Sequence, residues 1–402
     1  MSELLTRPAA TPRSAAQTSV KARARFRAFV DEFVVPGAAA WDESGTIPPE
    51  VLDAVSAAGL WAAVLPEARG GTGTGMADFG VLHEEIGRGC SSLRSLLTVH
   101  SMVLYALDRW GTPALRERWL EPMISGQVLG GFCLTEPDAG SDIAALRTTA
   151  RRSSAGYLID GLKQWTTGGQ RAGVLLTFAK TERGISVFLV DGSAPGVSRQ
   201  PVEGMLGTRA SMLAHIRFEG CLVGADALIG VEGAGLGLAA GLLDIGRYSV
   251  ACGSAGIIQA CLEASVRHAA WRTQGGGQLR QHQLIQQLIT KMAVDAQAAR
   301  LLCEQAGSLK DAGDPATLAA TCHAKYFASA AAMRAASDAV QIQGAMGCAP
   351  GADVARYFRD AKVMEIIEGS TQILELLIAN DACQRFGEHG PRQEAATRRR
   401  LM

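Results

Sequence analysis

The chain has 402 residues, of which 48% are hydrophobic and 19% charged, and its 39 Lys and Arg residues balance its 39 Asp and Glu residues. A chain of this length is expected to hold roughly two or three domains. Because the formal net charge is zero, nothing indicates a basic surface for nucleic acid or an anionic membrane. Every apolar run is interrupted before the roughly 20 residues that span a bilayer. We therefore expect neither nucleic-acid nor membrane partners.

The nine cysteines are scattered without a CxxC pair, which is typical of reduced thiols in a cytoplasmic protein. The segment His83-Glu84-Glu85 lacks the second histidine of a zinc helix, so no metal site is predicted. The first 25 residues are rich in Ala, Arg, Thr and Ser, and Glu3 is their only acid. This composition has two interpretations, a mitochondrial transit peptide and a disordered leader over residues 1–20, and we favour the leader.

Residues 21–127 are expected to form an α-helical domain. Between Phe26 and Val34 the apolar residues recur at steps of three and four, which predicts one amphipathic helix. Pro48 and Pro49 are suited to the first turn of a second helix. Further helices are expected at 79–87, 93–110 and 113–125, after a glycine-rich loop at 66–75.

The next segment, 128–232, changes to short runs of β-forming residues bounded by Gly, Pro, Asp and Ser. Strands are expected at 130–135, 157–161, 174–178, 185–190 and 215–218. Helical patterns then return at 237–270, 281–310, 315–343 and 371–386. Four long helices with short connections predict a bundle over 233–388, followed by a tail at 389–402. The predicted fold class is α+β, mainly α.

Two segments of the β-domain have features of a flavin site. Residues 132–142, read as FCLTEPDAGSD, form a strand that stops at Pro137 and a turn through Gly140. Such a turn leaves backbone N–H groups and hydroxyls directed outward, where they can hold a flavin edge or a phosphate. The second segment, 161–169, reads GLKQWTTGG and contains Trp165 and Thr167.

These segments resemble the acyl-CoA dehydrogenase family, and the resemblance extends over about residues 23–386 in the family's order. It implies FAD as the cofactor, a helical N-terminal domain, a central β-barrel-like domain and a C-terminal four-helix bundle. It also implies that Trp165 packs on the isoalloxazine ring and that Thr167 reaches its polar edge. By the same resemblance, the first segment contributes Phe132, Leu134, Thr135, Gly140 and Ser141 to the cofactor site.

The resemblance continues into the bundle, where it implies a cofactor shared between subunits. Arg272 and Gln283 lie in the region that holds the flavin pyrophosphate of a neighbouring subunit, and arginine pairs bidentately with phosphate. Gln341 and Gly344 belong to a glycine-rich turn near the adenosine end of that FAD, and Thr371 and Gln372 complete the expected set. The chain departs from the family at Gly275, usually Phe, and at Ala345 and Met346, usually Gly and Asn. We therefore expect a homo-oligomer, either a dimer or a tetramer.

The resemblance continues through residues 359–361 and 365–373, and it makes Glu368 the predicted catalytic residue. Removal of hydrogen across Cα–Cβ needs a base for the α-proton while hydride leaves the β-carbon for flavin N5. A carboxylate among apolar residues can serve, because desolvation raises its pKa. Glu368 follows Ile366-Ile367 and precedes a helix that Ser370 could cap. The alternative is a first-turn residue favoured only by the helix dipole. Some family members carry the base on the first bundle helix, where this chain has Gly246.

The resemblance also implies substrate contacts by Ser141, Asp244, Arg247 and Gly369, with the thioester carbonyl polarised by the Glu368 N–H and a flavin ribose hydroxyl. Residues 209–216, RASMLAHI, look more like members of polyketide and nonribosomal peptide pathways than like β-oxidation enzymes. The connection 311–315 shows no arginine for a CoA nucleotide. An acyl-CoA and an acyl group on a carrier protein, including a hydroxymalonyl-type extender unit, therefore both stay open.

The sequence has three other interpretations. The segment GAGLG at 233–237 resembles a dinucleotide loop, but no strand–helix–strand unit surrounds it, which disfavours a Rossmann dehydrogenase. An acyl-CoA oxidase that returns electrons to oxygen and a non-catalytic acyl-thioester-binding scaffold of the same fold stay open. For a dehydrogenase, an electron-transfer flavoprotein is a candidate electron acceptor.

Overall fold

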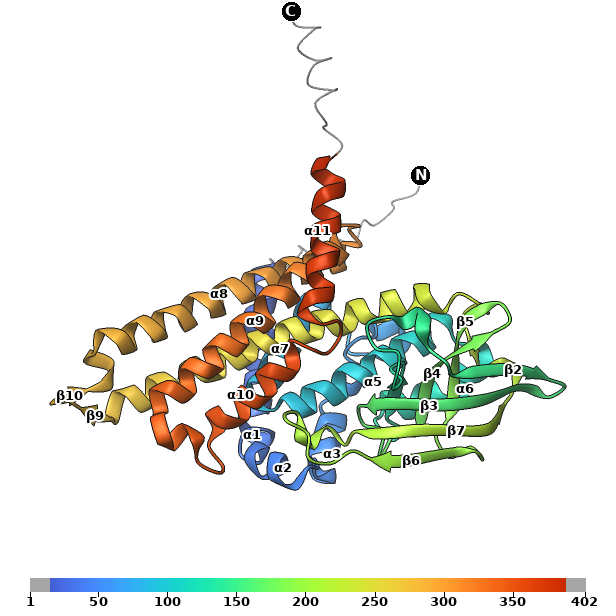
Figure 1. The fold of residues 1–402 in the computed structure, drawn as a ribbon, viewed down its shortest axis with the longest axis horizontal. Helices are drawn as coiled ribbons and strands as arrows, with labels where there is room; N and C mark the ends of the chain where they lie inside the picture. The colour runs from blue at the N-terminus through green and yellow to red at the C-terminus, as the bar shows by residue number, and fades with distance from the viewer. Residues whose placement is uncertain (1–14, 388–402) are drawn as a thin grey trace, which may run out of the picture.

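The structure is a computed structural model, and it describes residues 15–387 (Figure 1). The predicted order of helices, strands and helices is confirmed. Helix α1 already begins at Ala15, within the expected leader, whose first 14 residues lie outside the described part, as does the expected tail.

Six helices form the N-terminal part. They are α1 Ala15–Phe33, α2 Ala38–Ser44, α3 Pro49–Ala57, α4 Met76–Gly89, α5 Ser91–Trp110 and α6 Pro113–Ile124. Thr112 caps α6, because its side chain accepts a hydrogen bond from the Leu115 N–H at 3.2 Å. Helix α5 is buried along most of its length, so it passes through the core and presents its polar residues to the interior.

The β-domain is one eight-stranded sheet in the order β6-β7-β3-β2-β4-β5-β8, with β1 paired in parallel to β4. The strands are β1 Gly130–Cys133, β2 Thr149–Ser153, β3 Gly156–Thr166, β4 Val174–Thr181, β5 Gly184–Asp191, β6 Val197–Pro201, β7 Ala214–Val223 and β8 Leu228–Ile229. Strands β2 and β6 were not expected, because their sequences are largely polar and exposed and so lack an apolar alternation.

The C-terminal part contains α7 Gly235–Trp271, α8 Gln283–Ala312, α9 Thr317–Gln343, α10 Asp353–Met364 and α11 Thr371–Gly387, with a small hairpin of β9 Thr273–Gln274 and β10 Gly277–Gln278. Helices α7, α8 and α9 lie side by side, and the hairpin lies at the end farthest from the sheet (Figure 1). Helix α11 projects away from the body. Helix α10 was not expected and adds a fifth helix to this part.

Helix α7 is long and apolar enough to cross a membrane by length and composition, but 78% of its most apolar window is buried inside the protein. This burial is typical of the core helix of a helical bundle. Its glycines let α4 approach closely: a Cβ at Gly256 would lie 2.0 Å from the Glu84 carbonyl oxygen, and one at Gly87 would lie 2.6 Å from the Gly253 Cα. The α4–α7 contact therefore depends on residues without side chains.

Replacing Gly256 by alanine is expected to lower the free energy of unfolding by about 1–3 kcal/mol, because the new methyl group overpacks the contact with α4. The matched control is Gly237→Ala on the same helix, where no atom lies within 4 Å of the new Cβ. That change should be neutral or stabilise by up to about 1 kcal/mol. Urea denaturation of both variants checks the expectation, and equal effects would contradict it.

Candidate active site

Glu368 lies in the connection between α10 and α11, in a backbone conformation that a residue with a side chain rarely adopts. Its φ is +58° and that of Gly369 is +97°. A non-glycine residue in this region costs of order 1–3 kcal/mol, and it persists only where the surroundings hold it. Ser370 accepts a hydrogen bond from the Ile373 N–H at 3.4 Å, as expected for a cap on the following helix.

The Glu368 carboxylate is aimed at α7. Its Oε2 is buried and has no hydrogen-bond partner in the part of the chain that the structure describes. The facing residue is Gly246, where a Cβ would lie 2.3 Å from Oε2. Burial raises the pKa of Glu368 to about 7, against the opposing charges of Arg247, Arg94 and Lys325. Glycine at position 246 therefore leaves the space that the carboxylate occupies.

Three cations surround this carboxylate from three different helices. Arg247 of α7 donates from Nε to the Glu368 carbonyl oxygen at 3.1 Å, and Lys325 of α9 donates from Nζ to the Gly369 carbonyl oxygen at 2.8 Å. Arg94 of α5 is fully buried and affects Glu368 through its charge. Sequence reasoning selected Arg247 and missed the other two. Asp244, another predicted substrate contact, accepts a hydrogen bond from Lys310.

A buried ion pair joins the two flavin segments of the β-domain. Lys163 is fully buried and donates to Glu136 at 2.6 Å and to the Leu134 carbonyl oxygen at 3.1 Å. The Gln164 N–H also donates to the Thr135 carbonyl oxygen at 2.8 Å, so both segments are held side by side. Burial raises the pKa of Glu136, but the hydrogen bonds from the Arg147 N–H and the Lys163 ammonium outweigh it and lower the pKa. Glu136 thus has a structural role, which is to join the two flavin segments within the β-domain.

The register of β3 against β7 shifts between Lys163 and Thr166, and Trp165 sits in this irregularity with a φ of +60°. The backbone turns the indole outward, where it is 47% exposed and lies edge-on to His215 at 5.1 Å between ring centroids. A Cβ on exposed Gly140 would meet no atom within 4 Å. An open apolar ring beside an open turn fits the flat isoalloxazine of FAD.

The other predicted cofactor residues of this domain are distributed around the same strand ends. Thr135 and Thr167 are half-buried, and Ser141 is exposed. Leu134 is buried in the core, and the Phe132 ring packs against Phe178 at 5.2 Å between centroids. Leu134 would therefore present only its backbone to a cofactor, whereas the half-buried Phe132 side chain stays partly accessible.

A second group of predicted cofactor residues lies elsewhere in the chain. Arg272 and Gln283 flank the β9–β10 hairpin, at the end of the molecule opposite the sheet (Figure 1). Gln341 is exposed at the end of α9, and Gly344 follows it with a φ of +61°. Thr371 and Gln372 start α11. One chain does not bring the hairpin residues to Trp165.

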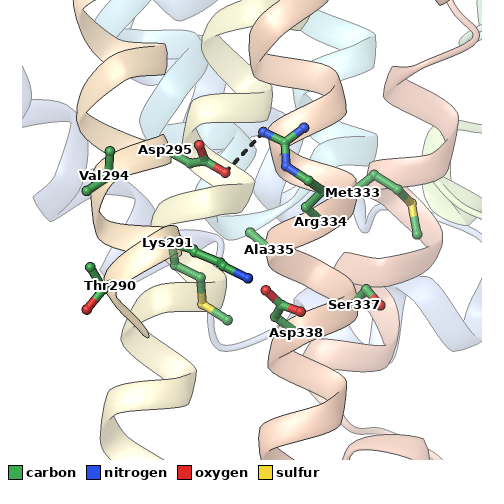
Figure 2. A pocket seen from close by; sticks show the side chains of 10 residues that line it. Thr290, Lys291, Val294, Asp295, Met333, Arg334, Ala335, Ser337 and Asp338 are labelled. Carbon is green, nitrogen blue, oxygen red and sulfur yellow. Dashed lines mark hydrogen bonds and ion pairs between the residues drawn. The ribbon is translucent and has the colours of Figure 1, made fainter. Parts of the chain in front are cut away.

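A groove of about 730 Å³ between α8 and α9 contains none of the predicted site residues (Figure 2). Its charged lining is partly paired, with Arg334 donating to Asp295 at 3.1 Å. The groove therefore lies apart from the chemistry around Glu368.

Three profiles of known families match the chain: the acyl-CoA dehydrogenase N-terminal domain at 17–127, the middle domain at 131–221 and the C-terminal domain at 233–383. The chain belongs to the acyl-CoA dehydrogenase family. Members of this family are FAD-dependent oxidoreductases, so the predicted family, enzyme class and cofactor are confirmed.

Three similar proteins show the range of the family. The mitochondrial short-chain specific acyl-CoA dehydrogenase of Rattus norvegicus is 36% identical over 90% of this chain and 89% of its own length. The structure of FkbI, for biosynthesis of the methoxymalonyl extender unit of a polyketide, is 34% identical with a TM-score of 0.82, covering 90% of this chain and 99% of its own. A Mycobacterium smegmatis glutaryl-CoA dehydrogenase in complex with FADH2 is 27% identical with a TM-score of 0.87, covering 93% and 96%.

Glu136→Gln should leave the buried ammonium of Lys163 without its carboxylate, at a cost of about 3–5 kcal/mol in the free energy of unfolding. Because the pair joins the two flavin segments, the FAD content of the purified protein should fall as well. The control is Asp295→Asn, which breaks the more exposed pair with Arg334 and should cost less than about 1 kcal/mol. Unchanged FAD content in Glu136→Gln would contradict this role.

Glu368→Gln should make the protein more stable at pH 8 than the wild type, and this difference should vanish near pH 4. The raised pKa means that the folded state binds the Glu368 proton more tightly than the unfolded chain does. Stability is therefore lost as pH rises from the ordinary value of 4.5 through about 7. Chemical denaturation of both proteins across this range measures the difference, and a constant difference would contradict the raised pKa.

Proposed function

We propose that this chain catalyses the FAD-dependent dehydrogenation of an acyl thioester, with Glu368 as the base that removes the α-proton. The supporting observation is the Glu368 carboxylate opposite Gly246, whose Oε2 is buried without a hydrogen-bond partner among residues 15–387 and whose pKa is raised to about 7. A base with a pKa near the working pH combines an ionised fraction with a useful proton affinity.

FAD held by the 132–142 segment and Trp165 would supply the acceptor for the hydride that leaves the substrate. The chain's own residues carry out the rest: Glu368 takes the proton, and the three surrounding cations stabilise its ionised form. The Glu368 N–H has no acceptor among the described residues, so it is available to the thioester carbonyl, as the family resemblance implies. Asp244, Gly369 and Ser141 remain proposed substrate contacts.

The visible spectrum of the holoenzyme under anaerobic acyl thioester tests this function. Wild-type protein should bleach, while Glu368→Gln should bind FAD equally and bleach at least about 10³-fold more slowly, because the general base is absent. A matched variant is Glu365→Gln, three residues earlier on the same connection, which should bleach at close to the wild-type rate. Equal bleaching of wild type and Glu368→Gln would overturn the assignment, and failure to retain FAD would favour the scaffold.

For the substrate class, Arg94 supports an acyl group with a second carboxylate. Its side chain is buried, and its hydrogen-bond partners are the hydroxyls of Ser95, Thr98 and Ser249 and the Met364 sulfur. Its Nε has no partner, and no carboxylate pairs with it in the part of the chain that the structure describes. Burial lowers its pKa to about 10. A buried guanidinium without a directly paired carboxylate is costly, and a substrate carboxylate would match its fork.

For two classes of acyl group, the loss of one proton to Glu368 and of one hydride gives a balanced oxidation. A glutaryl-type group loses its α-proton to Glu368 and a hydride from its β-methylene. A hydroxymalonyl-type group has no hydrogen on its β-carbon, so Glu368 would take the hydroxyl proton, the hydride would leave the α-carbon, and a ketone would form. The names of the glutaryl-CoA dehydrogenase and FkbI relatives agree with a dicarboxylic acyl group. We propose a carrier protein, rather than CoA, as its bearer, on the likeness to FkbI and the RASMLAHI segment.

Arg94→Met should lower kcat/KM for glutaryl-CoA by about 10²–10³, because truncating one partner of a buried charge pair costs about 2–5 kcal/mol. With butyryl-CoA, which has no second carboxylate, the loss should stay within about tenfold. Arg94→Lys should restore part of the glutaryl-CoA activity. Equal losses with both esters would contradict a carboxylate subsite and leave the dehydrogenase function standing. Turnover of the hydroxymalonyl thioesters of CoA and of a carrier protein should be compared to test which group carries the substrate. Faster turnover of the CoA ester would contradict the carrier-protein proposal.

The proposed quaternary state is a homo-oligomer, supported by the separation of the β9–β10 hairpin from the sheet within one chain (Figure 1). The electron acceptor is proposed to be an electron-transfer flavoprotein, with oxygen as the alternative. Oxygen consumption during turnover distinguishes the two. A cytoplasmic location is likewise proposed, from the scattered reduced cysteines.

A further inference from the structure

Lys325 is a buried cation that the chemistry above uses only through its charge on Glu368. Its side chain on α9 is fully buried, and no carboxylate pairs with it within the described residues. Its ammonium donates to the Gly369 carbonyl oxygen at 2.8 Å and faces that of Glu365 at 3.4 Å. The Lys325 ammonium thus binds backbone carbonyl groups of the turn that carries Glu368.

Arg247 holds the same turn from the other side. From α7, its Nε donates to the Glu368 carbonyl oxygen at 3.1 Å, so two successive carbonyl groups are held by cations of two different helices. Hydrogen bonds from an ionised donor are about twice as strong as neutral ones. The held residues, Glu368 and Gly369, are those with positive φ. A strained turn of this kind needs such external support.

We propose that Lys325 is a positioning residue that, with Arg247, holds the strained turn at Glu368 and Gly369 and thereby keeps the carboxylate aimed past Gly246. This inference rests on Glu368 being the base. Released from its carbonyl contacts, the turn would relax toward negative φ and move the carboxylate away from α7. The effect would appear in the chemical step and in the ionisation of Glu368, and only weakly in substrate affinity.

The charges around Lys325 give the expected pH dependence its sign. It is faced by Glu368 and Glu365 of the connection, by Arg247 of α7 and by Cys322 of its own helix. Burial lowers the pKa of Lys325 to about 8, and burial raises that of Glu368 to about 7. Below about 7 the base is protonated, and above about 8 the ammonium loses its proton. Flavin reduction should therefore fall on both sides of this range.

The test measures anaerobic flavin reduction against pH in wild type, Lys325→Met and Lys325→Gln. Lys325→Met should lower the maximal reduction rate by about 10–100-fold with less than a threefold change in the half-saturating substrate concentration. The fall of the reduction rate on the acidic side of the pH profile, its acid limb, should move up by about one pH unit, because a neighbouring positive charge is lost. Lys325→Gln keeps one donor without the charge, so it should retain more of the rate while showing the same shift. Lys325→Arg should restore the limb.

Arg356→Met is the matched structural control. Arg356 is also buried and donates to a backbone carbonyl, that of Gly89, at 2.9 Å. Its loss should lower the free energy of unfolding of the FAD-free protein as much as Lys325→Met does, with an unmoved acid limb. An acid limb unchanged in both Lys325→Met and Lys325→Gln would overturn the inference. Failure of the proposed function is distinguishable, because wild type would then show no acid limb and Glu368→Gln would remain active.

Discussion

The structure depends on one constraint: the Glu368 carboxylate must be desolvated enough to have a raised pKa and must still be able to ionise. Burial of Glu368 raises its pKa, and the charges of Arg247, Arg94 and Lys325 prevent the rise from going further. The space for the carboxylate comes from Gly246, and its direction comes from a turn with positive φ. Each of these contributions comes from a different element, so the site exists only when α5, α7, α9 and the α10–α11 connection are packed together.

Buried charges also fix the geometry of the two flavin segments. A single buried ion pair, Glu136 with Lys163, fixes the relative position of two strand ends that are almost thirty residues apart, and the bulge beside it turns Trp165 outward. The proposed base and the exposed indole are thus both presented by strained backbone that buried charges hold in place. Strain at a functional site is costly to stability, and here the neighbouring ion pairs and cation–carbonyl bonds support it.

The fold and Glu368 could be predicted from the sequence because both have local sequence features. Long helices such as α7 and α9 show in long proline-free runs rich in alanine. Glu368 shows in its match to the family motif, supported by its apolar neighbours and the following cap. Strand β2 was missed because its sequence is polar. Helix α10 was missed although its 12 residues form an amphipathic helix. Arg94 and Lys325 were missed for another reason. Each stands in an ordinary helical pattern, and only the packing of distant helices shows that its charge is buried without a carboxylate.

The central claim is that the Glu368 carboxylate removes the α-proton, and isotope release tests it most directly. Glutaryl-CoA labelled with deuterium at the α-carbon is incubated anaerobically with holoenzyme, and loss of the label to solvent water is followed in wild type and Glu368→Gln. We predict rapid loss of the label in wild type and none above the spontaneous rate in Glu368→Gln, with FAD bound equally in both. Release of the label by Glu368→Gln at the wild-type rate would contradict it and would place the base elsewhere.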